Sequence, residues 1–185
     1  MSMTQAPPEL LADGELYLRR WQVSDADALE AAASSSIAEL SLWMPWAAKG
    51  YSGKDAQQFL EFTTRSWEAG DQYDYAVIID GQPSGSCGLM RPSREKTDTF
   101  EIGYWLATNV TGRGWATRAA ALLVKVAREL DAKQVRIVHA QLNIRSSKIP
   151  LRLGFTCTGT HSMVLRGSEE RAQCVVWELA LAQQT

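Results

Sequence analysis

Two glycines in front of a predicted helix are the first residues whose spacing suggests chemistry. Thr111-Gly112-Arg113-Gly114 follows a strand-like run over 99–107 and precedes an amphipathic run over 116–130. Glycine lets the backbone turn tightly and approach a ligand without a Cβ in between. The N–H groups of a first helical turn lack helical partners, and the helix dipole adds positive potential there. The segment therefore predicts either a phosphate or pyrophosphate site, or a tight turn with a helix cap.

Two common phosphate-binding fingerprints do not fit this segment. No Lys-Ser or Lys-Thr pair follows the glycines, as a P-loop requires, and the third glycine of the dinucleotide fingerprint is missing. Two further polar residues stand downstream, where Asn143 and Ser146 lie at the start of a short segment over 146–153 that ends at Gly154. Asn is a good helix N-cap and Gly a common C′ residue, so a short helix is predicted here.

The elements that must position these residues follow from periodicity and turn signals. The order is one strand, two helices, three strands, a helix, a strand, a helix and two strands, with a broken helical segment over 40–51. This order predicts a mixed sheet in an α/β or α+β sandwich. Residues 1–12 are expected to be a flexible N-terminal arm before a single domain over 13–185. The predicted strands cover 16–21, 73–80, 83–90, 99–107, 135–141, 155–165 and 172–182, the predicted helices cover 24–34, 52–67, 116–130 and 146–153, and tight turns fall at Asp80-Gly81 and Gly167-Ser168.

Composition limits the class of protein. The 185 residues are 45% apolar and 22% charged with a formal net charge of −2, which argues against a nucleic-acid-binding surface. The three cysteines show no metal-binding or disulfide spacing, which favours a reducing compartment. No signal peptide and no apolar run of about 20 residues is present, so we expect a cytoplasmic protein without membrane or metal sites.

Three separated segments resemble the GNAT superfamily of N-acetyltransferases, in the order that superfamily has them. Thr111–Ala116 is similar to its motif A, Arg/Gln-x-x-Gly-x-Gly/Ala, with Thr111 at the position where Arg or Gln is usual. Asn143–Ser146 with Leu153–Phe155 is similar to motif B. The strand Glu101–Leu106 looks like the RimJ/RimL branch, which acetylates N-terminal amines of ribosomal proteins, and Trp43–Trp46 contains a Pro-Trp element of that branch. The resemblance covers 16–181.

The resemblance implies a fold and a cofactor. The fold is a GNAT-type mixed, mostly antiparallel seven-stranded sheet flanked by about four helices. The pantetheine arm of acetyl-CoA would lie where the fourth and fifth strands splay apart, and no metal is implied. The implied cofactor-binding residues are Trp105, Leu106 and Ala107 through their backbone, Asn143 through its side chain, and the loop and first helical turn, Gly112, Arg113, Gly114, Trp115, Ala116 and Thr117.

The same resemblance suggests catalytic roles for two side chains. Glu101 is the candidate base, acting directly or through water; alternatively it orients substrate or pairs with an arginine. Ser146 is the candidate proton donor to the leaving sulfur; alternatively it only begins the short helix. Asn143 is equally suited to cap that helix. The aromatic residues expected at the acceptor cleft are Trp21, Trp43, Trp46 and Tyr104.

The predicted activity is transfer of an acetyl group from acetyl-CoA to a primary amine by direct attack in a ternary complex. A protein or peptide N-terminus is the first acceptor class, and a small amine such as an antibiotic, a polyamine or an amino-acid metabolite is the alternative. A non-catalytic acyl-CoA sensor is a rival from another class, as is a protein that holds a nucleotide at the glycine turn. The sensor is favoured by Thr111 and by the apolar Met163-Val164-Leu165, where some branch members carry a second carboxylate. Expected partners are acetyl-CoA and the amine, with no nucleic acid and no membrane; a homodimer is compatible with the resemblance.

Overall fold

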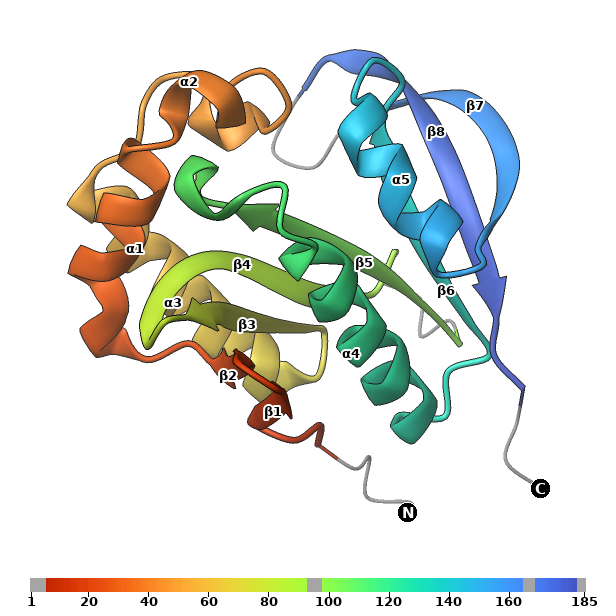
Figure 1. Cartoon of the computed structure of the whole chain (residues 1–185), viewed down its shortest axis with the longest axis horizontal. Helices are drawn as coiled ribbons and strands as arrows, with labels where there is room; N and C mark the ends of the chain where they lie inside the picture. The colour runs from red at the N-terminus through yellow and green to blue at the C-terminus, as the bar shows by residue number, and fades with distance from the viewer. Residues whose placement is uncertain (1–5, 93–97, 165–168, 183–185) are drawn as a thin grey trace.

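One mixed sheet organises the molecule. The computed structural model describes residues 6–92, 98–164 and 169–182, and the turn predicted at Gly167-Ser168 lies outside them. Within these ranges eight strands form a sheet of order β1-β2-β3-β4-β5-β6-β8-β7 (Figure 1). All neighbours are antiparallel except β5 and β6, which are parallel. The strands are β1 Leu10–Asp13, β2 Leu16–Arg20, β3 Gln72–Ile79, β4 Gln82–Met90, β5 Thr99–Leu106, β6 Gln134–Ala140, β7 Thr156–Val164 and β8 Arg171–Ala180.

The predicted fold class is confirmed, with one strand more than the seven expected among the described residues. The additional strand is β1, which pairs with β2 from Leu10↔Arg19 to Asp13↔Leu16. Residues 10–12 therefore do not belong to a loose arm, as the sequence had suggested. Four residues without clear alternation give little local signal, and their extended form depends on pairing with the edge of β2. Residues 1–5 lie outside the described ranges.

Five α-helices flank the sheet in the described part of the chain, rather than about four. The fifth is the short α2, whose four residues are too few for a periodic signal. The packing places α1 and α3 on one face of the sheet and α4 on the other, where α5 follows it (Figure 1). The helices are α1 Ala26–Ser34, α2 Ile37–Leu40, α3 Gly53–Ala69, α4 Trp115–Glu129 and α5 Ile144–Arg152, with a 3-10 turn at Pro45–Ala47.

Local chemistry explains where the long helices begin and end. Ser52 and Asp55 form a capping box at the start of α3, and Gly70 ends it in the left-handed conformation with φ 74°. The start of α1 differs from the prediction, because its N-cap is Asp25 and not Ser24. The Asp25 side chain caps the 3-10 turn Val23–Asp25 that precedes α1. The Asp25 carboxylate accepts a hydrogen bond from the backbone N–H of Gln22 at 2.9 Å.

Two hydrophobic cores lie on opposite faces of the sheet because side chains alternate along each strand. On β3, Tyr75 and Val77 join the large core beneath α4. Ala76 and Ile78 join a smaller core beneath α1 and α3. No helix of the described residues has both the length and the apolar character needed to cross a membrane.

The pairing of β4 with β5 generates a stability prediction at Gly85. A Cβ on Gly85 would lie 2.3 Å from the backbone oxygen of Trp105 and 2.9 Å from Cα of Leu106. Backbone cannot move aside as a side chain can. We therefore expect Gly85→Ala to lower the free energy of unfolding by about 1–3 kcal/mol, and the thermal midpoint by roughly 2–12 °C.

Gly53→Ala is the matched control, since its Cβ would meet only the flexible carboxylate end of Glu30 at 2.9 Å. Alanine is favoured over glycine in a helix by up to about 1 kcal/mol, so this variant is expected to be no less stable than wild type. Calorimetric measurement of the thermal midpoints of both variants checks the prediction. The prediction is wrong if Gly85→Ala and Gly53→Ala have the same midpoint.

Candidate functional site

The site is created where the two parallel strands separate. β5 and β6 are paired only from Thr99↔Gln134 to Glu101↔Arg136. Beyond these three pairs β5 stays paired with β4, and β6 stays paired with β8 (Figure 1). The splayed strands expected from the GNAT resemblance are therefore present, and the opening begins directly after Glu101.

The backbone of β5 offers the opening fewer groups than expected. The N–H of Ala107 donates to the carbonyl of Ser84 at 2.8 Å, and the Ala107 carbonyl accepts from Val110 at 3.1 Å. Because backbone groups of alternate residues point to the same side of a strand, those of Trp105 also face β4 and those of Leu106 face the opening. Of the three residues expected to pair with a cofactor arm, the geometry thus supports only Leu106.

A cavity of about 710 Å³ runs from the α1/α3 face of the sheet into this opening. Its aromatic wall is built around Trp46, whose ring centroid lies 5.2 Å from that of Tyr51 and 5.6 Å from that of Trp105. Polar groups from both separated strands and from α5 also line it, namely Glu101, Tyr104, Arg136, His139, Asn143 and Ser146. The structure therefore brings the predicted catalytic residues and most of the predicted acceptor-cleft residues to one cavity.

Trp21 is the exception among the aromatic residues predicted to line the acceptor cleft. It is buried in the smaller core. Its indole N–H donates to Oγ of Ser86 at 3.1 Å, and its ring packs edge-on against Phe59. Trp21 therefore supports the cavity from behind, and this prediction was wrong.

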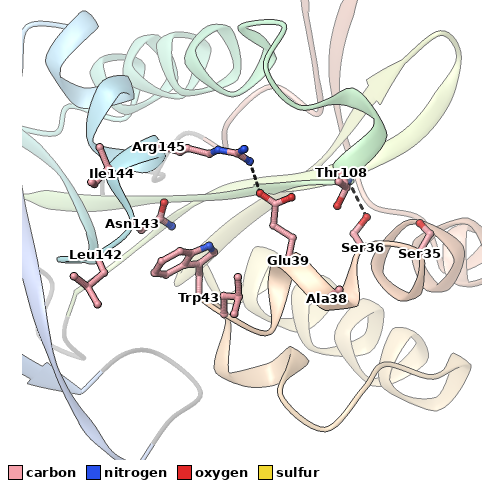
Figure 2. A pocket seen from close by; sticks show the side chains of 11 residues that line it. Ser35, Ser36, Ala38, Glu39, Trp43, Thr108, Leu142, Asn143, Ile144 and Arg145 are labelled. Carbon is pink, nitrogen blue, oxygen red and sulfur yellow. Dashed lines mark hydrogen bonds and ion pairs between the residues drawn. The ribbon is translucent and has the colours of Figure 1, made fainter.

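A second cavity of about 610 Å³ adjoins the first between α2 and the start of α5. Trp43 and Asn143 line both cavities. Figure 2 shows the side chains of Glu39 and Arg145 reaching across this cavity to form an ion pair. The tandem arrangement leaves room for an elongated ligand that passes Asn143.

Glu101 is held by an ion pair across the last paired position of the two strands. Its Oε2 accepts from Nε of Arg136 at 2.8 Å and lies 2.7 Å from Nη2. The two side chains remain about a quarter exposed, so the carboxylate is reachable from the cavity. The arginine partner considered at the sequence level is thus real. Both contacts fall on Oε2, which leaves Oε1 for a substrate or water.

Ser146 lies on the other side of the opening, in the first turn of α5. Its backbone N–H donates to Oδ1 of Asn143 at 3.1 Å, so Asn143 is the helix N-cap. Its Oγ lies 2.9 Å from the hydroxyl of Tyr104. Burial raises the pKa of Tyr104 to about 12, so its hydroxyl stays protonated at neutral pH.

The glycine loop has the conformation that its sequence suggested. Gly112 and Gly114 adopt φ values of 79° and 84°, which glycine tolerates best. Gly114 is the N-cap of α4 and has no side chain to occupy the first-turn N–H groups. The hydroxyl of Thr111 donates to the carbonyl of Thr108 at 2.9 Å, so it closes the turn before the loop.

Two arginines near this loop have different environments. Arg118 forms an ion pair with Asp13 of β1 at 2.6 Å, which ties α4 to the edge of the sheet. Arg113 is exposed, and its guanidinium lies over the ring of Trp115 at 5.5 Å. Trp115 itself is buried, so only its backbone can face a ligand at the helix start. The Arg118 guanidinium lies over the same ring at 4.8 Å, so of these two arginines Arg113 is the exposed one beside the first turn of α4.

Sequence reasoning missed Arg136 and Tyr51. Arg136 alternates with apolar residues on β6, and only the parallel register shows that it faces Glu101. Tyr51 ends an irregular segment that also contains Trp43 and Trp46, and this cluster of aromatics outside a regular element was the available signal. Among the described residues, no group of three acidic, cysteine or histidine side chains is arranged to hold a metal.

Comparison with known proteins decides the family. The acetyltransferase (GNAT) domain model matches residues 15–156. This chain belongs to the GNAT acetyltransferase family. The family inferred from the glycine loop and the Asn143–Ser146 segment is therefore confirmed.

Ribosomal N-acetyltransferases are among its relatives in sequence and in fold. "Putative ribosomal N-acetyltransferase YdaF" of Bacillus subtilis (strain 168) is 34% identical over 80 residues, so the match spans 43% of each chain. The solved structure of the ribosomal-protein α-N-acetyltransferase RimL with coenzyme A has a TM-score of 0.82 at 20% identity, covering 94% of this chain and 98% of RimL. The microcin self-immunity acetyltransferase MccE, solved with acetyl-CoA and AMP, also has a TM-score of 0.82 at 20% identity, covering 91% and 94%.

The glycine loop yields a binding prediction for this GNAT protein. A Cβ at Gly114 would meet no atom within 4 Å, so Gly114→Ala acts only through its φ of +84°. The left-handed conformation costs residues other than glycine about 1–2 kcal/mol. We expect the loop to change its conformation to avoid this cost, so that the N–H groups at the start of α4 are no longer aligned. We expect the dissociation constant of coenzyme A, measured by titration calorimetry, to rise roughly 5- to 30-fold, as about 1–2 kcal/mol implies.

Gly81→Ala is the matched control, because it introduces the same backbone strain at a turn away from the Gly114 loop. Gly81 has φ +76° in the β3–β4 turn and also has open space around it. This variant should lose comparable stability and bind coenzyme A within about 2-fold of wild type, a difference of less than about 0.5 kcal/mol. Equal affinities in the two variants would contradict a role for the Gly114 loop in coenzyme A binding.

Proposed function

We propose that this protein is an acetyl-CoA-dependent N-acetyltransferase that transfers an acetyl group directly to an amine. Its single domain, predicted over 13–185, also includes β1 from Leu10. The observation that carries the proposal is the position of Glu101 and Ser146. They come from different elements on opposite sides of the opening between β5 and β6, and they line one cavity. That arrangement supplies a proton acceptor and a proton donor on two sides of a reacting group.

We assign the cofactor to the part of the surface where the chain offers hydrogen-bond donors, from the glycine loop to the opening between β5 and β6. The pyrophosphate lies at the loop Gly112–Gly114 and the first turn of α4, where N–H groups and the dipole attract anions. The arm passes Asn143 and the backbone of Leu106 into the opening. RimL and MccE, which share this fold, were solved with coenzyme A and acetyl-CoA respectively.

The chemistry requires a neutral amine and a leaving sulfur. The amine nitrogen attacks the thioester carbonyl carbon, a C–N bond forms, and the C–S bond then breaks. The proton lost by the amine goes to Glu101, directly or through water, while Ser146 donates a proton to the departing sulfur. The products are an N-acetyl amide and the free thiol of coenzyme A.

A peptide or protein N-terminus is the acceptor that we propose first. An α-amino group has a pKa near ~7.7–8.0 and a lysine near ~10.4, so about a tenth of N-termini is already neutral at pH 7. Glu101, whose Oε2 is engaged by Arg136, then needs to act only as a modest base. The names of YdaF and RimL, which refer to ribosomal proteins, support the same class.

A small amine is the second candidate, favoured by the size and lining of the cavity. Its volume of about 710 Å³ falls in the range of roughly 300–1,000 Å³ typical of small-molecule sites. The aromatic wall formed by Trp46, Tyr51 and Trp105 could enclose such a ligand. An activity assay therefore has to decide between a peptide N-terminus and a small amine as the acceptor.

The test is thiol release from acetyl-CoA with a panel of N-terminal peptides and small amines. We expect release that depends on one amine class, and we expect Glu101→Gln to lower kcat about 100-fold, within the usual range for removal of a general base. Ser146→Ala should lower kcat about 10-fold, because a thiol near pKa ~8.5 leaves with limited assistance.

Ser147→Ala is the matched control on the same helix. The Ser147 hydroxyl donates to the carbonyl of Ile144 at 2.7 Å and does not line either cavity. Its kcat should stay within about 2-fold of wild type, a barrier change below about 0.5 kcal/mol. Tight acetyl-CoA binding without thiol release for any amine would instead favour the acyl-CoA sensor.

A further inference from the structure

The contact between Tyr104 and Ser146 has a consequence for the leaving group. Their hydroxyl oxygens lie 2.9 Å apart, and the Tyr104 oxygen lies 3.4 Å from the Ser146 carbonyl. Tyr104 is on β5 and Ser146 on α5, so this contact spans the opening between the separated strands. In the part of the chain that the structure describes, Tyr104 provides the one side chain hydrogen-bonded to Oγ of Ser146.

We propose that Tyr104 is a positioning residue for proton transfer to the leaving sulfur: its hydroxyl donates to Oγ of Ser146 and thereby directs the Ser146 proton into the opening. This inference rests on the proposed function. A phenol is a stronger acid than an aliphatic alcohol, so in a Tyr–Ser pair the tyrosine is the better donor. When one lone pair of Oγ accepts from Tyr104, the O–H of Ser146 is free to donate to a group in the cavity.

Both hydroxyls are held in place before any ligand arrives. The Asn143 cap fixes the first turn of α5, and the ring of Tyr104 packs against the large core. A donor aligned in advance needs no reorganisation as negative charge builds on sulfur. Because burial raises the pKa of Tyr104, it remains a donor throughout the pH range in which a thiol titrates.

The electron balance of the step is simple. The C–S bonding pair leaves with sulfur, the Ser146 O–H bond breaks toward sulfur, and the Tyr104 O–H stabilises the alkoxide character that develops on Oγ. Glu101 releases the proton that it took from the amine to solvent, and Ser146 regains a proton from solvent, so the enzyme returns to its starting state. Tyr104 acts only through Ser146, and it gives up no proton to the substrate.

The kinetic test is a double-mutant cycle with Tyr104→Phe and Ser146→Ala. We expect Tyr104→Phe to lower kcat about 5- to 10-fold, with the KM for acetyl-CoA and for the amine within 2-fold of wild type. In the Ser146→Ala background, Tyr104→Phe should have less than a 2-fold further effect, because its partner is gone. Tyr73→Phe removes a buried tyrosine hydroxyl outside both cavities and serves as the control for folding and melting.

A binding test needs no acceptor. Coenzyme A carries a thiol, and its desulfo analogue lacks it. If Ser146 donates to the sulfur, it stabilises the bound thiolate, so the affinity for coenzyme A relative to desulfo-coenzyme A rises between pH 7 and 9.5. The ratio cancels the pH dependence that both ligands share. Charged or ionisable neighbours that act on the thiolate itself, among them Glu101, Arg136 and His139, are common to wild type and both variants, so the comparison among these proteins isolates the two hydroxyls. We expect the ratio to rise about 5-fold or more in wild type, less in Tyr104→Phe, and not at all in Ser146→Ala.

The outcomes separate the two proposals. Additive effects of the two substitutions, a Tyr104→Phe effect confined to the KM of the amine, or no effect would overturn the positioning role while the transferase assignment stands. If wild type releases no thiol with any amine, the proposed function fails. The binding ratio then decides the inference by itself: a flat ratio in wild type overturns it, and a rise that depends on both hydroxyls supports it.

Discussion

The separation of two parallel strands is the constraint on which the site depends. After three residue pairs, β5 continues along β4 and β6 continues along β8, each with its other edge fully paired. Closing the opening would require one of these long antiparallel ladders to break. The backbone groups that face the opening therefore stay directed at it, as an edge that an extended ligand can meet.

Several features of the chain serve to keep that opening in shape. Gly85 allows β4 to approach the end of β5 closely, where a side chain would meet backbone. The Glu101–Arg136 ion pair spans the last paired position, and the Tyr104–Ser146 contact spans the region beyond it. An ion pair thus joins β5 to β6 where they are paired, and a contact between hydroxyl groups joins β5 to α5 beyond that point. An ion pair at the closed end also places a carboxylate at the start of the opening without leaving it unpaired.

The helix termini complete the arrangement. α4 begins at Gly114 with its N–H groups uncovered, whereas α5 begins with its first turn capped by Asn143. The two starts therefore have different uses. The first presents backbone donors to an anion, while the second fixes a side chain, Ser146, at a defined position. Both helices lie on the same face of the sheet, so a single extended ligand can reach both (Figure 1).

The sequence by itself determined the features that depend on neighbours in the chain. The glycine loop, the capping box at Ser52, the stop at Gly70 and the long helices all follow from residues within a few positions of one another. The same local patterns carried the family resemblance. The elements that the sequence pattern did not predict are short. β1 and α2 have four residues each, which is too few for a periodic pattern to be recognised.

Only the tertiary structure decided which side chains meet. Glu101 and Arg136 are 35 positions apart, and Tyr104 and Ser146 are 42 apart. Their contacts depend on strand register and on where α5 docks, and a shift of one residue along a strand would turn a side chain to the other face. The same holds for Ala107, whose backbone groups are already used, and for Trp21, which the smaller core takes up. Sequence pattern can nominate residues for a site, but the packing of distant segments determines their partners.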